Sequence, residues 1–161
     1  SVVMEIVNKF PDLVTSACLV NPVGFAKEVN RNFLEIFLTA SKRKEMKEAL
    51  IKLFYSSENL SRTMVENSLR HNRLEGVISQ LKLIVDKNFP DYIQATDWLP
   101  LLSSSSIPFQ VILGVHDEII QYDTKVFPDN VLIKEIEKAG HMVHMEQPTE
   151  FNQILKKYLK S

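Results

Sequence analysis

The chain has 161 residues, of which 45% are hydrophobic and 24% charged, and its 19 Lys and Arg residues nearly balance its 20 Asp and Glu residues. This length is typical of one domain, and the balanced charge argues against nucleic acid or a membrane surface as a partner. No apolar run reaches the roughly 18–20 residues that span a bilayer, and the first ten residues lack the charged start of a signal peptide. A single cysteine, Cys18, makes neither an internal disulfide nor a zinc site alone. We therefore expect a cytoplasmic chain of the α/β or all-α class.

The first 24 residues predict a helix followed by a buried strand. The expected helix ends before Pro11, which cannot continue it. Its apolar face is made of Val3, Ile6, Val7 and Phe10. The run at 17–20 is short, apolar and bounded by turn-forming residues, a pattern that favours a buried strand.

Between residues 25 and 87, apolar residues recur with the period of a helix and predict four amphipathic helices. Ser57 or Asn59 is the expected N-cap of the third. The apolar positions are Phe25, Val29, Phe33, Ile36 and Phe37, then Met46, Leu50, Leu53 and Phe54, then Leu60, Met64, Val65 and Leu69, and finally Leu74, Val77, Ile78, Leu81 and Ile84. Such stripes form packed cores far more often than ligand sites, so we interpret this region as a packed helical lobe.

The last third of the chain predicts two more strands and a closing helix. Residues 88–108 are interpreted as a connector that includes a four-serine loop, 103–106; no glycine flanks these serines, which argues against a nucleophile there. Strands are expected at 109–113 and 131–136, a short helical stretch near 121–127, and a helix from Pro148. Alternating strands and helices indicate an α/β fold with a parallel sheet.

Two titratable residues follow successive strands at the edge where parallel sheets place their active sites. Asp117 lies three residues after Gly114, and His141 directly follows Gly140. A carboxylate there can accept the Nδ1 proton of the histidine, which fixes the tautomer for proton transfer at Nε2. Taken singly, Asp117 could equally be a turn residue and His141 a structural histidine. The remaining histidines are weaker candidates: His71, His116 and His144.

Two of these segments resemble the α/β-hydrolase family. The sequence ILGVHDEII at 112–120 resembles the family's acid turn, and AGHMVHMEQP at 139–148 resembles its histidine loop. Residues 1–24 are similar to the helix and strand that follow the nucleophile elbow of that family. Within the lobe, SRTMVE at 61–66 and RLEGV at 73–77 resemble the hydrolase-type acetyltransferase component of acetoin dehydrogenase.

The resemblance implies the C-terminal part of an α/β-hydrolase, with a helical cap at 25–98 and a C-terminal αβ part at 99–161. Asp117 would be the acid of a catalytic triad and His141 its general base. The family's Gly-x-Ser-x-Gly motif is absent from the sequence, so we expect the nucleophile upstream of residue 1. Ser1 is a poor substitute because no glycines precede it. No metal or organic cofactor is implied.

Two functions from different classes follow. The first is half of a serine hydrolase for an ester, thioester or related acyl bond of a small molecule, inactive as this chain alone. Five aromatic residues are candidates for lining an acyl pocket or for plain core packing: Phe25, Phe33, Phe37, Phe54 and Trp98. The second is a non-enzymatic module, because an open edge of the sheet would favour a homo-oligomer or pairing with a missing N-terminal half.

Overall fold

The computed structural model describes residues 2–160, so Ser1 lies outside the described residues. The strands are β1 (Ala17–Val20), β2 (Phe109–Gly114) and β3 (Val131–Ile136). The helices are α1 (Val2–Lys9), α2 (Arg31–Thr39), α3 (Arg43–Ile51), α4 (Arg62–Asn72), α5 (Val77–Asn88), α6 (Leu99–Ser104), α7 (Val143–Glu146) and α8 (Pro148–Tyr158). None of these helices is long and apolar enough to cross a membrane.

The three strands form a parallel sheet in the order β1-β2-β3. Val20 is paired with Ile112, and Gly114 with Ile136, so the carboxyl ends of all three strands lie at one edge. β2 is buried along its whole length because it has a strand on either side and helices over both faces. The predicted strands and their parallel arrangement are confirmed.

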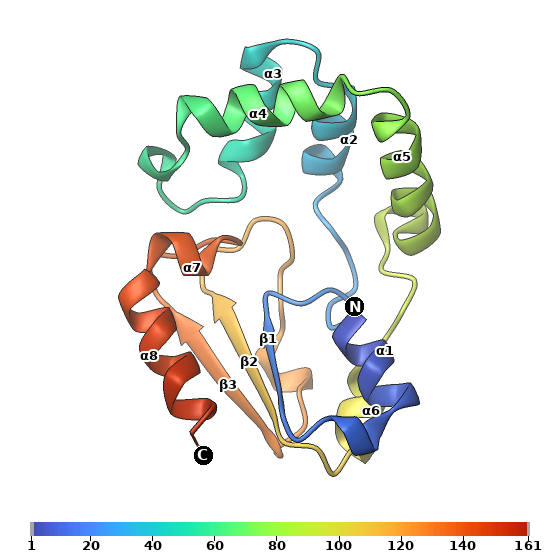
Figure 1. Cartoon of the computed structure of the whole chain (residues 1–161), viewed down its shortest axis with the longest axis vertical. Helices are drawn as coiled ribbons and strands as arrows, with labels where there is room; N and C mark the ends of the chain where they lie inside the picture. Colours follow the sequence, from blue (N-terminus) through green and yellow to red (C-terminus); the bar gives the residue numbers. More distant parts are fainter. Residues whose placement is uncertain (1, 161) are drawn as a thin grey trace.

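Alternation along β2 divides the core into two layers. Val111 and Leu113 pack in one hydrophobic cluster with α1 and α6, whereas Ile112 packs on the opposite face with α7 and α8. In Figure 1 these two pairs of helices lie on opposite sides of the sheet. The result is a helix–sheet–helix sandwich, the usual way to bury a parallel sheet.

The helices α2 to α5 lie between β1 and β2 in the chain and form a separate helical lobe, residues 31–88, beyond the carboxyl edge of the sheet (Figure 1). The lobe has its own small core, made of Met46, Leu50, Val65 and Leu69. Four inserted helices were predicted, and four are present. The predicted limits at residues 25 and 98 stay a prediction.

The two chain segments that connect the lobe to the sheet run side by side. Val29 N–H donates to Tyr92 O, and Trp98 N–H donates to Gly24 O. Gly24 has φ +91, and a Cβ there would lie 2.2 Å from Cδ1 of Trp98. Glycine is therefore required at this crossing by both conformation and space.

Several local predictions were wrong, each for a physical reason. The helix of the second predicted stripe ends at Ile51, before Leu53 and Phe54. The helix of the first begins at Arg31, because Asn30 caps α2 through its side chain, and residues 25–30 are bends and an isolated bridge rather than helix. Ser61, rather than Ser57 or Asn59, accepts the N–H of Met64 and caps α4. Pro100 lies in the first turn of α6, so Ser103 and Ser104 of the predicted four-serine loop are helical. Residues 121–127 contain only a 3₁₀ turn.

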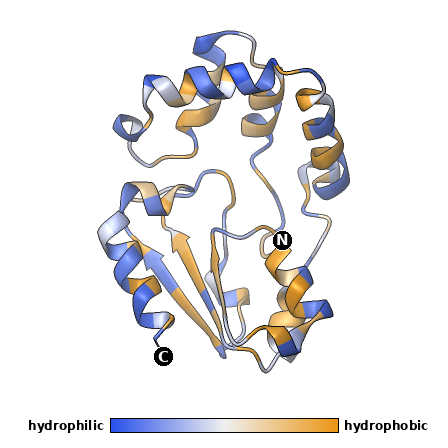
Figure 2. Cartoon of the chain, viewed as in Figure 1, coloured by the Kyte–Doolittle hydropathy of each residue, from blue (hydrophilic) through white to orange (hydrophobic). Residues whose placement is uncertain are grey.

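The buried face of α1 also differs from the prediction. Met4 and Val7 are buried against the sheet, whereas Val3, Ile6 and Phe10 are 40%, 41% and 56% exposed. Figure 2 shows hydrophobic residues along α1, at the side of the molecule next to β1. Of the predicted apolar face, Val7 is covered by the described part of this chain, and Val3, Ile6 and Phe10 are not.

Candidate active site

The turn after β2 holds Asp117 as a buried carboxylate whose side chain is 2% exposed. Its Oδ1 atom accepts the N–H groups of Ile119 at 2.7 Å and Ile120 at 3.1 Å. A buried carboxylate needs such donors, because an unpaired charge away from water is costly. The two backbone bonds fix the carboxylate and leave Oδ2 free for another donor.

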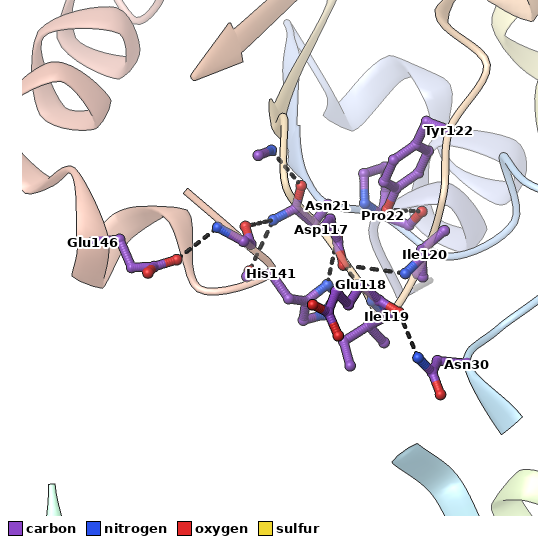
Figure 3. A network of polar contacts seen from close by, with 12 residues as sticks. Asn21, Pro22, Asn30, Asp117, Glu118, Ile119, Ile120, Tyr122, His141 and Glu146 are labelled. Carbon is purple, nitrogen blue, oxygen red and sulfur yellow. Dashed lines mark hydrogen bonds and ion pairs between the residues drawn. The ribbon is translucent and has the colours of Figure 1, made fainter. Parts of the chain in front are cut away.

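His141 supplies that donor from the loop between β3 and α7. Its Nδ1–H donates to Oδ2 of Asp117 at 2.8 Å (Figure 3). Since an ionised carboxylate only accepts hydrogen bonds, Nδ1 carries the proton and Nε2 of the neutral ring has a lone pair. The side chain is 24% exposed, and among residues 2–160 no group is hydrogen-bonded to Nε2. This nitrogen is available to accept a proton.

The two loops meet because the ends of β2 and β3 approach closely. Val115 N–H donates to Ile136 O, and His116 N–H donates to Ala139 O at 2.9 Å. A Cβ on Gly114 would lie only 2.1 Å from the carbonyl oxygen of Gly140. The glycine at the end of β2 thus permits the approach that puts the carboxylate beside the imidazole.

Glu146 connects the histidine loop to the helical lobe. One carboxylate oxygen accepts the N–H of Gly140 at 2.6 Å, and the other accepts the N–H of Ser56 at 3.0 Å and the side-chain amide of Asn59 at 3.2 Å. Met142 N–H adds a bond to Leu53 O. The loop that carries His141 is therefore attached to the segment between α3 and α4.

Asn30 makes the corresponding connection to the acid turn. Its backbone N–H donates to Ile119 O at 2.8 Å, and its side-chain amide donates to Glu118 O at 2.7 Å. The same side chain accepts the N–H of Phe33 and so caps α2. The first helix of the lobe begins on the turn that holds Asp117.

Tyr122 lies close behind the acid turn. Its hydroxyl donates to Pro22 O at 3.0 Å. Burial, helped by the nearby charge of Asp117, raises the pKa of Tyr122 above its usual range. The group is therefore a hydrogen-bond donor under ordinary conditions and not a base.

The other predicted candidates lie apart from this pair. The ring of His116 lies tilted against Tyr55 at 4.4 Å between centroids, and the ring of His144 lies 6.0 Å from that of Phe151. His71 is exposed on α4. The five aromatic residues pack with other apolar side chains: Phe25 and Trp98 beside the sheet, Phe33 and Phe37 in the lobe, and Phe54 in a buried position.

Three residues that organise the site were not singled out from the sequence, namely Asn21, Asn30 and Glu146. Each acts through contacts with residues far away in the chain, which periodicity and spacing do not reveal. The local signals were ambiguous: Asn21 precedes Pro22 in a turn, Asn30 lies within the first predicted helical stripe, and Glu146 lies near the end of the segment 139–148 that carries His141.

Two curated proteins resemble the chain over almost its whole length. It is 35% identical over 150 residues to the dihydrolipoyllysine-residue acetyltransferase component of the acetoin cleaving system from Cupriavidus necator, and 27% identical to the protein of that name from Pseudomonas putida. The matches include 92% and 99% of this chain but 40% and 43% of the relatives. The chain thus spans about two fifths of the length of these relatives. No protein-family model matches it.

Two solved structures that superimpose on the chain are a hydrolase and an esterase. A meta-cleavage product hydrolase from Pseudomonas fluorescens superimposes with a TM-score of 0.81 at 12% identity, over 98% of this chain and 60% of that one. Naproxen esterase from Bacillus subtilis superimposes with a TM-score of 0.69 at 18% identity, over 98% and 55%. The sheet, the inserted helices and these superpositions agree with the expected resemblance. The chain has the fold of the C-terminal part of an α/β-hydrolase.

Proposed function

We propose that the chain is the acid- and histidine-bearing half of a serine hydrolase that acts on an ester, thioester or related acyl bond of a small molecule. The observation that carries this proposal is the buried Asp117 bonded to Nδ1 of His141, with Nε2 unpaired. In this role His141 takes the proton of a serine hydroxyl as the serine attacks the acyl carbon, and then gives it to the leaving alcohol or thiol. Asp117 holds the tautomer and stabilises the imidazolium.

The serine and the oxyanion-binding N–H groups would come from an N-terminal half. Two features support this division: the solved hydrolases extend well beyond the matched region, and the chain leaves an apolar face on α1 next to β1. That face consists of Val2, Val3, Ile6 and Phe10. An additional strand beside β1, with helices of its own half, would cover both the strand edge and the helix face.

The acceptor of the acyl group distinguishes hydrolysis from transfer. Water would give a hydrolase, whereas a thiol or alcohol would give an acyltransferase, as the names of the curated relatives suggest. The proton path through His141 is the same in both cases. We propose hydrolysis because the two solved structures described above are named as a hydrolase and an esterase.

The test begins with the coding sequence upstream of Ser1 and expression of the longer product. We expect a Gly-x-Ser-x-Gly serine that reacts with a fluorophosphonate and hydrolyses p-nitrophenyl acetate, while residues 1–161 alone do neither. His141→Ala should abolish labelling, and Asp117→Asn should lower kcat by about 10⁴-fold. His71→Ala and Asp86→Asn, on exposed lobe positions, serve as matched controls.

Two outcomes would contradict the proposal. One is covalent labelling of residues 1–161 alone, and the other is a longer product that has no such motif. In the latter case the alternative gains support, namely a module that self-associates through β1 and α1. A stable dimer in size-exclusion chromatography that is disrupted by Ile6→Glu would then identify that surface.

A further inference from the structure

Asn21 occupies a constrained position at the end of β1. It is 5% exposed and has φ +39, in the left-handed region that asparagine tolerates better than most residues. Its backbone N–H continues the sheet pairing by donating to Ile112 O at 3.0 Å. The unusual backbone conformation turns the side chain back along the carboxyl edge of the sheet rather than away from it.

The side-chain amide of Asn21 bonds to the end of β2 and to the histidine loop that follows β3. Its oxygen accepts the N–H of Gly114 at 3.0 Å. Its nitrogen donates to the carbonyl oxygens of His141 at 2.8 Å and Gly140 at 3.3 Å. Figure 3 shows this amide between the end of β2 and the histidine loop. The partners lie 93 to 120 residues away in the sequence, so one side chain connects three distant segments.

The bonds are placed to act on the imidazole of His141. They hold the carbonyl of His141 itself and that of the preceding residue, and Gly114 begins the turn that leads to Asp117. The side-chain amide of Asn21 therefore sets the distance between the start of the acid turn and the histidine loop. Catalytic geometry is sensitive to such distances, since a misplacement of about 1 Å can cost about 10²-fold in rate.

We infer that Asn21 is a positioning residue for His141, which keeps Nδ1 of the imidazole within hydrogen-bond distance of Asp117. Asn21 does not touch the reacting atoms; it acts through the peptide groups of Gly140 and His141. Only the catalytic consequence of this positioning rests on the proposed function. The positioning itself is a property of the chain and can be measured in the chain without any activity.

The first experiment is NMR of residues 1–161 labelled with ¹⁵N-histidine. The Nδ1 proton of His141 should give a downfield resonance that exchanges slowly with water and is absent from Asp117→Asn. Asn21→Gly removes the amide while suiting a positive φ, and we expect the exchange of this proton to become at least tenfold faster. Asn72→Ala is the matched control, because Asn72 is also buried and donates to Phe37 O within the lobe, away from the site.

A second variant distinguishes the loss of the two hydrogen bonds that Asn21 donates from the loss of its side-chain volume. Asn21→Asp keeps the shape and the acceptor for Gly114 N–H but has no donor for Gly140 and His141, so it should also accelerate exchange. The inference is overturned if the resonance is missing from the parent chain, or if it keeps its parent exchange rate in both variants. It is also overturned if both variants fail to fold while Asn72→Ala folds, because Asn21 would then be needed for folding itself.

In the longer product, Asn21→Gly should lower kcat with little change in KM, and Asn72→Ala should change neither. The two proposals can fail separately. A longer product without serine reactivity refutes the hydrolase but leaves the NMR result on Asn21 intact. Conversely, an active enzyme whose kcat is the same with Asn21→Gly refutes the positioning role and leaves the hydrolase in place.

Discussion

Replacing Glu146 by glutamine removes one of two acceptors that join the histidine loop to the lobe. If the new amide keeps its oxygen toward Ser56, its NH₂ group faces the N–H of Gly140, where the carboxylate accepted at 2.6 Å. If the amide flips, its NH₂ group faces the N–H of Ser56 instead. In either orientation one partly buried backbone N–H loses its acceptor, and no rotamer of glutamine satisfies both.

The expected loss follows from the kind of bond that is removed. A hydrogen bond to a charged group contributes about 1.5–3 kcal/mol, so Glu146→Gln should lower the unfolding free energy by about 2 kcal/mol. In a chain of this length that loss corresponds to a decrease in Tm of about 4–8 °C. Glu146→Ala, which removes both acceptors, should cost more, about 3 kcal/mol.

The assay is urea unfolding followed by circular dichroism and by the fluorescence of Trp98. Glu150→Gln is the matched control, because Glu150 is an exposed carboxylate in the first turn of α8 and its neutralisation should cost only about 0.3–1 kcal/mol. Equal midpoints for Glu146→Gln and Glu150→Gln would refute the reasoning. So would a Glu146→Ala variant as stable as the parent.

Two further predictions concern the packing and the electrostatics of the site. Gly114→Ala should cost about 3 kcal/mol in urea unfolding, because its Cβ would lie 2.1 Å from the carbonyl oxygen of Gly140 and backbone atoms cannot move aside cheaply. Gly76→Ala, with φ +78 but open space around it, should cost only about 1–2 kcal/mol, and equal losses would argue against the clash. Tyr122→Phe should cost about 1 kcal/mol near neutral pH, since Pro22 O loses its donor. Above about pH 10 that difference should shrink, because the raised pKa keeps Tyr122 protonated in the folded state while it ionises in the unfolded state, and the parent then loses up to about 1.4 kcal/mol per pH unit. Urea midpoints for parent and variant at about pH 8 and 10.5 measure this, and a constant difference would contradict the raised pKa.

The strands and the Asp117–His141 pairing were accessible from the sequence because both depend on local rules. β-branched runs bounded by glycine and proline mark strands, and the ends of parallel strands share one edge. A carboxylate after one strand and a histidine after the next then lie at the same edge of the sheet. The 2.8 Å bond between Asp117 and His141 is the geometric outcome of that rule.

The rest depended on contacts that local rules do not contain. Periodicity located an apolar face on α1 but could not tell which face this chain covers, and Met4 is buried where Ile6 is not. Likewise, Asn30 lies inside the first predicted helical stripe, between its apolar positions Val29 and Phe33. The side chain that caps α2 also donates to Glu118 O in the acid turn, 88 residues further on, and this distant contact helps to hold it in the capping position.

The lobe is attached to the acid turn and to the histidine loop by different residues, and this has a consequence for how the site can change. Asn30 bonds to the carbonyls of Glu118 and Ile119, and Glu146 joins Gly140 to Ser56. A rigid rotation of the lobe about its two connecting segments would break bonds at one loop or the other. Substitutions in the lobe can therefore alter the geometry of the pair without touching either side chain. In this fold the placement of the lobe and the geometry of the Asp117–His141 pair depend on the same hydrogen bonds.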